Sequence, residues 1–169
     1  RHRRAGCSGL QGGESRRRNR VEAGSGGQLH DAIGAGANLF EKAFGPYNFW
    51  FESSDRRFIF FHSANWEDPD GFRPEWLKST VDDSTKPVII FSHTSLRDSE
   101  RFAGHAAQVF DSVLNDQKVQ LALNGHNHVF QYYENNGTVM LQSPRVEGQR
   151  WLLLEIQGGN LKIQRMSTG

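Results

Sequence analysis

The segment that most constrains the fold of this chain is an uninterrupted apolar run, Val88 to Phe91, which lies between Pro87 and the pair Ser92-His93. Its residues do not alternate between apolar and polar, so the strand they form has no face suited to water. Short strands of this kind are typical of the centre of a sheet that is covered on both sides. The sequence therefore predicts a layered domain with His93 at the carboxyl end of a central strand.

The order of the other expected elements predicts an α/β fold. Helical patterns stand between apolar strands in the first part of the chain, and an antiparallel β meander with Asn-Gly and Gly-Gly turns follows residue 128. Helices are expected over 39–43, from Pro74 to Val81, and over 106–114, and strands over 47–52, 57–62, 88–92, 119–123, 129–134, 138–142, 151–157 and 161–165.

The first 29 residues differ in composition from the rest. Residues 1–20 hold seven arginines against Glu14, a net charge of +6, so the remainder carries −5 of the total of +1. We interpret residues 1–29 as a disordered or non-native tail and residues 30–169 as one folded domain. The tail lacks interleaved aromatic residues and a recognisable nucleic-acid fold, so nucleic acid is not expected as a partner. Binding to nucleic acid whose steep salt dependence is lost when residues 1–20 are removed would indicate the opposite.

Several protein classes are excluded by what the sequence lacks. The single cysteine, Cys7, excludes an internal disulfide and a Cys-rich zinc module. No apolar stretch approaches the roughly 20 residues that cross a bilayer, so no membrane-spanning segment is expected. Neither observation assigns a cellular compartment.

Histidines follow two of the predicted strands. His93 ends the central strand, and residues 119–123 run into Asn124-Gly125-His126-Asn127-His128. Open α/β sheets place ligand sites beyond the carboxyl ends of their strands, and neutral imidazole is the commonest metal-binding side chain. We expect Gly125 to allow a sharp turn that brings both following imidazoles toward the same point. Any one of these histidines alone is an ordinary polar residue; together they predict a metal site.

These segments resemble a known family. Residues 88–96 and 123–128 match, in order, context and separation, the last two motifs of calcineurin-like metallophosphoesterases. Residues 44–51 and 57–61 look like the strand pair that follows the family's Gly-Asn-His-Asp/Glu motif. The resemblance covers roughly residues 30–169 and implies the C-terminal half of the family's α/β/β/α sandwich.

The resemblance also implies an activity, which is the metal-dependent hydrolysis of a phosphate ester. His93 and His126 would bind one metal and His128 the other, in a site of two divalent ions (Mn, Fe or Zn) bridged by a carboxylate and by the hydroxide that attacks phosphorus. His30, in the segment Gly27 to Asp31, would match the general acid that protonates the leaving oxygen. Leu29, however, stands where the family has a metal-binding Asn, so either that ligand is lost or the match fails and His30 is an ordinary loop histidine.

Part of the family pattern is missing. Residues 1–29 contain no counterpart of the Asp-x-His and Gly-Asp-x-x-Asp motifs, which supply early ligands and the bridging carboxylate. Three neutral imidazoles would then face two dications without charge compensation. We therefore expect the chain as given to bind one metal or none and to be weakly active or inactive. The alternative hypothesis is a truncated, catalytically incomplete fragment that acts as a metal-binding or structural module.

Other residues invite functional interpretations that the sequence favours less. A cupin-like barrel would use His126, His128 and Glu134, but the spacing is poor and the preceding helices do not fit a barrel. Four aspartates are interpreted as turn or loop residues, the tryptophans as packing residues, and two arginines after His93 as solvated loop charges. These are Asp68, Asp70, Asp82 and Asp83; Trp50, Trp66, Trp76 and Trp151; and Arg97 and Arg101.

Overall fold

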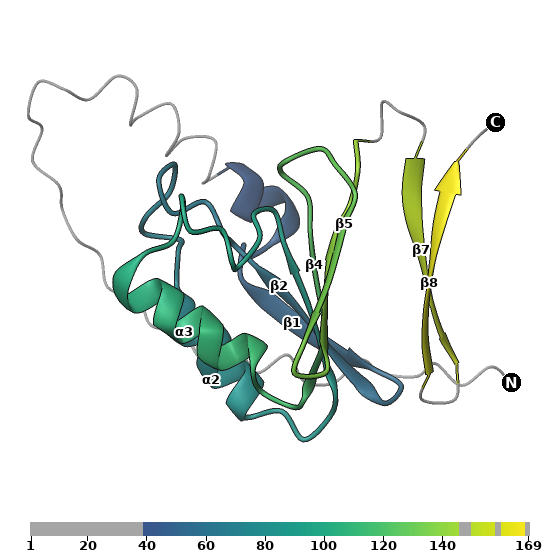
Figure 1. Ribbon diagram of the computed structural model, residues 1–169. Coiled ribbons are helices and arrows are strands. Elements are labelled where there is room, and N and C mark those ends of the chain that lie inside the picture. The colour runs from purple at the N-terminus through teal and green to yellow at the C-terminus, as the bar shows by residue number, and fades with distance from the viewer. Residues whose placement is uncertain (1–38, 146–149, 158–159, 168–169) are drawn as a thin grey trace, which may run out of the picture.

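The computed structural model describes residues 39–145, 150–157 and 160–167 and shows a mixed α/β fold (Figure 1). A helical segment at 39–44 precedes the first strand. The remaining elements, in chain order, are β1 Phe49–Ser53, β2 Arg56–Phe61, α2 Pro74–Asp82, β3 Val88–Ser92, α3 Gly104–Leu114, β4 Val119–Asn124, β5 Gln131–Asn135, β6 Thr138–Gln142, β7 Arg150–Gln157 and β8 Asn160–Ser167.

The strands form one sheet of six and one of two. The larger sheet has the order β1-β2-β3-β4-β6-β5, and the smaller consists of β7 and β8. Strands β2, β3, β4 and β6 are parallel to their neighbours in that series, while β1 and β5 pair antiparallel at the two edges. The prediction of a central strand at 88–92 is confirmed, because Val88, Ile89 and Ile90 are all fully buried.

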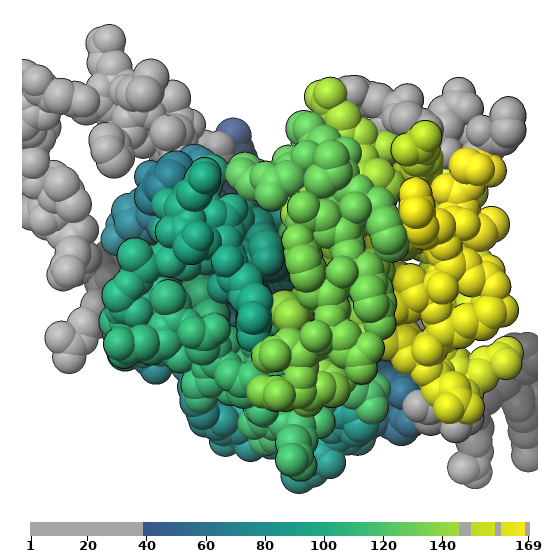
Figure 2. All heavy atoms as spheres, in the orientation of Figure 1, coloured from purple at the N-terminus to yellow at the C-terminus, as the bar shows by residue number. Residues whose placement is uncertain are grey.

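Layers on both sides of the large sheet explain why β3 is apolar throughout. Ile90 points to the same side as Ile59 and packs under α2 and α3, with Leu77 and Phe110 in the same core. Ile89 points to the other side, where its cluster packs against the β7–β8 hairpin through five partly buried residues: Leu152, Leu154, Ile156, Leu161 and Ile163. The hairpin forms the outer layer on that side (Figures 1 and 2).

The predicted antiparallel meander is wrong in its pairing. Strand β5 is antiparallel to β6, but β6 lies parallel beside β4, and β7–β8 form a separate sheet. Burial gives the physical reason. Met140 and Leu141 of β6 are buried, whereas Tyr132 and Tyr133 of β5 are 53% and 55% exposed, so the more apolar strand takes the inner place.

Three of the minor interpretations can be checked against the contacts. Asp68 accepts the Gly71 backbone N–H at 3.2 Å, as expected of a turn residue. The exposed Trp66 is not a packing residue of the core, because its ring carries the Arg101 guanidinium 4.2 Å from the ring centroid. Arg101 is not a solvated charge either: its Nη1 lies 2.9 Å from Glu67 Oε2, and only 13% of its side chain is exposed.

Asn124 connects the end of β4 to its neighbours. It is 7% exposed, and its Nδ2 donates to Oε1 of Gln142, its cross-strand partner on β6, at 3.0 Å. Gln142 Nε2 in turn donates to the Val129 carbonyl at 3.0 Å. This relay ties together β4, β6 and the chain that follows His128.

Replacing Phe110 by Ala should lower the free energy of unfolding by about 3–5 kcal/mol, because the fully buried ring leaves a cavity among three other rings. These are Phe61, Phe72 and Phe102, with centroids 5.6, 6.0 and 5.0 Å away. Urea unfolding followed by circular dichroism measures the loss. The neighbouring exposed Asp111→Ala is the control and should stay within about 0.5 kcal/mol. A loss below about 1 kcal/mol for Phe110→Ala would contradict this account of the core.

Replacing Asn124 by Leu should cost about 1–3 kcal/mol, because the buried Gln142 Oε1 loses its donor. The double variant Asn124→Leu/Gln142→Leu should recover part of that loss, since no polar atom of the pair is then left buried without a partner. A double-mutant cycle in urea measures the coupling free energy. Additive costs would show that the two amides do not depend on each other.

Candidate functional site

The ends of β3 and β4 bring two predicted histidines together. Because the strands are parallel neighbours, His93 and the loop at Gly125 leave the sheet at the same edge. The Gly125 N–H donates to the His93 carbonyl at 2.9 Å, which fixes one loop against the other. The sequence rule about carboxyl strand ends therefore holds for this pair.

The turn that presents the imidazoles differs from the one expected. Gly125 does not adopt a positive φ, and an added Cβ there would meet only the His93 carbonyl at 3.9 Å, an ordinary contact. The left-handed conformations fall instead on His126 (φ 72°) and His128 (φ 59°). Non-glycine residues adopt such angles rarely, and they are enriched where function constrains the backbone.

Two imidazoles meet at close range. His126 Nδ1 lies 3.2 Å from His93 Nε2, with the ring centroids 5.1 Å apart and the planes at 82°. An imidazole nitrogen lies about 2.0–2.1 Å from a tetrahedral zinc ion, so two such ligands are separated by about 3.4 Å. The observed separation fits a hydrogen bond between the rings and also fits two ligands of one ion.

His128 lies at the rim of the same region. His128 is exposed, and it lines a cavity of about 360 Å³ together with His93 and His126. Within the described part of the chain, no three His, Cys, Asp or Glu side chains gather closely enough to hold a metal ion. Within the described residues, therefore, two imidazoles come together without the further donors that a two-metal centre needs. His30, the predicted general acid, lies outside the described residues.

The electrostatics at His93 favour its neutral ring. Desolvation by the surrounding loops lowers the pKa of His93, and the nearby His126, Arg101 and His128 lower it further, while Glu67 opposes them. Each of these causes except the last disfavours the imidazolium form. The neutral form is the one that offers a nitrogen lone pair to a metal.

A further histidine, His62, stands at a strand end that the sequence analysis did not select. His62 directly follows β2, the other parallel neighbour of β3, so the same positional rule indicates it. Its Nε2 lies 3.1 Å from Asp68 Oδ2, and its ring packs 4.8 Å from that of Tyr47. His62 belongs to a different pair from His93 and His126, but it borders the same cavity as His93.

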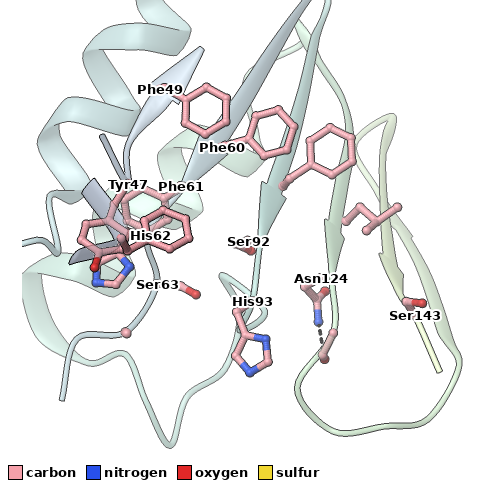
Figure 3. A pocket seen from close by; sticks show the side chains of 15 residues that line it. Tyr47, Phe49, Phe60, Phe61, His62, Ser63, Ser92, His93, Asn124 and Ser143 are labelled. Carbon is pink, nitrogen blue, oxygen red and sulfur yellow. Dashed lines mark hydrogen bonds between the residues drawn. The ribbon is translucent and has the colours of Figure 1, made fainter. Parts of the chain in front are cut away.

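That cavity has a volume of about 410 Å³ and lies beside the histidine pair. Figure 3 shows Phe49 and Phe60 along one side of it, Tyr47 and His62 at one end, and His93 and Asn124 on the opposite side. Its remaining lining includes Phe91, Leu123 and Gly125. The imidazoles of His93 and His62 are therefore among the polar groups that border a largely apolar space.

None of the helices among the described residues is long and apolar enough to span a bilayer.

Comparison with known proteins gives only distant similarities. No protein-family model and no curated protein sequence matches the chain. Among solved structures, GAP50, the anchor in the inner membrane complex of Plasmodium, is similar at a TM-score of 0.40 and 20% identity over 57% of this chain, which spans 35% of that protein.

Two further structures are similar at lower scores. The Thermotoga maritima protein TM1076 has a TM-score of 0.31 and 14% identity, with 56% of this chain and 73% of that one covered. Vacuolar protein sorting 29 from Cryptosporidium parvum has a TM-score of 0.22 and 13% identity, with 57% and 77% covered. Similarities of this size assign neither a family nor a function.

Proposed function

We propose that this chain carries the C-terminal, histidine-bearing half of a metallophosphoesterase site and that the complete protein hydrolyses a phosphate ester with the help of divalent metal. One observation carries the proposal: two imidazoles from the ends of adjacent parallel strands approach to 3.2 Å, the separation suited to two ligands of one ion. The motif resemblance at residues 88–96 and 123–128 points to the same chemistry.

The layering of the described residues is compatible with half of an α/β/β/α sandwich. Two helices cover one face of the large sheet, and a second, two-stranded sheet covers part of the other face. A second full sheet and a second helical layer would come from polypeptide outside the described residues.

The roles of individual residues follow from their donors. His93 and His126 would hold the first ion, and His128, whose backbone already places it at the rim, would approach the second. A bound ion of this kind neutralises charge on phosphate oxygens and lowers the pKa of water. Imidazole nitrogen suits Zn and Fe better than Mn, so a site made from this chain alone favours Zn or Fe. His30 remains the proposed proton donor to the leaving oxygen.

The charge balance limits what the chain does by itself. Two neutral imidazoles leave the charge of a divalent ion uncompensated, and within the described residues no carboxylate joins them. This observation favours the second candidate function, a catalytically incomplete fragment that binds one metal ion or serves as a structural module. The two candidates differ in whether added N-terminal polypeptide restores turnover.

Removing either close imidazole should abolish most metal binding by the full chain. We expect His93→Ala and His126→Ala each to weaken Zn²⁺ affinity by at least about tenfold, and His128→Ala to cause a smaller loss. Competition with a chromophoric chelator measures the affinities. His105→Ala is the matched control, because that exposed histidine pairs with Glu75 on the helical side and should leave affinity unchanged. Equal affinity in all four variants would refute the metal site.

Turnover separates the two candidate functions. The 169-residue chain with added Mn²⁺, Zn²⁺ or Fe²⁺ should hydrolyse bis(p-nitrophenyl) phosphate weakly or not at all, because the second metal lacks ligands. A protein extended at its N-terminus by polypeptide carrying Asp-x-His and Gly-Asp-x-x-Asp motifs should be active, and His126→Ala should remove that activity. An extended protein that stays inactive would contradict the phosphoesterase proposal and favour the structural-module hypothesis.

A further inference from the structure

The segment that follows β6 leaves the large sheet at the edge that carries the histidines. Strand β6 lies parallel beside β4, so the two strands end on the same side of the sheet. The Ser143 N–H donates to the Asn124 carbonyl at 2.7 Å and fixes the start of the segment against the end of β4. Pro144 follows, and its ring restricts the backbone φ angle. Arg145 is therefore connected to this edge by a short and restrained stretch of chain.

Arg145 lines the same 360 Å³ cavity as the three histidines at the ends of β3 and β4. Besides these histidines and Gly125, the lining consists of Ser143, Pro144 and Arg145. The list contains imidazole nitrogens, a hydroxyl and a guanidinium, and none of these described residues is an Asp or a Glu. Arg145 is also exposed, so a molecule from solvent can reach it. The side chains that border this cavity therefore suit an anion.

Two other arginines follow β3, and their surroundings differ. Arg101 forms an ion pair with Glu67 at 2.9 Å, and only a small part of its side chain is exposed. Arg97 lines a different cavity, to which Asp98 also contributes. A carboxylate beside a guanidinium compensates part of its charge and weakens its attraction for a further anion. Of these three arginines, Arg145 is the one that shares the cavity of the histidines.

A phosphate group suits the donors of this cavity. The planar guanidinium offers parallel N–H groups that match two phosphate oxygens, and it stays charged throughout the pH range in which proteins fold. It therefore attracts an anion without any ligand from polypeptide outside the described residues. A second metal ion, by contrast, needs carboxylates, which the described residues do not bring to the histidines. In this chain an arginine can supply the positive charge that a second ion cannot.

We propose that Arg145 binds the phosphate group of the ester directly and acts as the second positive centre of the site, beside an ion held by His93 and His126. The inference rests on the proposed function, because it takes the histidine pair as the metal-binding side of the cavity. In the complete protein the same guanidinium would donate to the phosphate oxygens on which negative charge develops during hydrolysis. Arg145 is thus assigned as a substrate-binding residue and not as a metal ligand, since a guanidinium has no lone pair to offer.

Two arginine substitutions form a matched pair on the full chain loaded with Zn²⁺. Arg145→Gln should weaken the binding of inorganic phosphate by about tenfold, the size of one lost charge-assisted contact, whereas Arg97→Gln should leave it within about twofold. Isothermal titration calorimetry measures both affinities, and thermal unfolding verifies that both variants fold. Arg145→Lys, which keeps the charge but loses the paired donors, should give an intermediate affinity. Equal phosphate affinity in Arg145→Gln and Arg97→Gln would overturn the inference.

Two further measurements separate failure of this inference from failure of the proposed function. Chelator competition should show that Arg145→Gln does not weaken Zn²⁺ affinity, and phosphorus NMR on the metal-free chain should detect weak phosphate binding that Arg145→Gln removes. If Zn²⁺ does not bind but this phosphate binding persists, the proposed function fails and the anion site stands. If Zn²⁺ binds normally and no phosphate binds with or without it, up to about 10 mM, the anion site fails and the metal site stands.

Discussion

The parallel pairing of β3 with β4 is the constraint on which the rest of the candidate site depends. Parallel strands end at the same edge of a sheet, so the residues that follow them meet without a long loop. The bond from the Gly125 N–H to the His93 carbonyl then fixes the two chain segments to each other. Antiparallel pairing would have placed His93 and His126 at opposite edges, and no local change of conformation could have brought their rings into contact.

The elements that the sequence predicted best are those whose residues are stable only in the buried centre of the sheet. Residues 88–91 are all apolar, so the burial of the strand at 88–92 follows from its composition. The pairing of β6 could not be predicted in the same way. Its apolar character requires an inner position, but the chain contains several apolar strands, and only the competition among them for the sheet centre decides which neighbour it takes. As a result β5, whose tyrosines are exposed, lies at the edge of the sheet.

The candidate site likewise combines features that the sequence pattern indicates with features that only the backbone conformation of the loop determines. Strand ends indicated His93 and His126, and the same rule, applied to β2, would also have indicated His62. Side-chain direction was less accessible, because it depends on which residues of the loop take left-handed conformations. The glycine was the natural candidate on steric grounds, yet His126 and His128 adopt these angles. His126 meets His93, whereas His128 is exposed and lines the same cavity.

Two adjacent features of the described residues are each incomplete. The imidazoles of His93 and His126 offer lone pairs to a cation but no negative charge to balance it, and the stacked rings of Phe49, Phe60 and Phe91 form an apolar part of the sheet face without a full cover. The second sheet that we propose for the complete protein would compensate both at once, because it would pack on this face and bring carboxylates to the histidine edge. The two features therefore favour the same proposed layer.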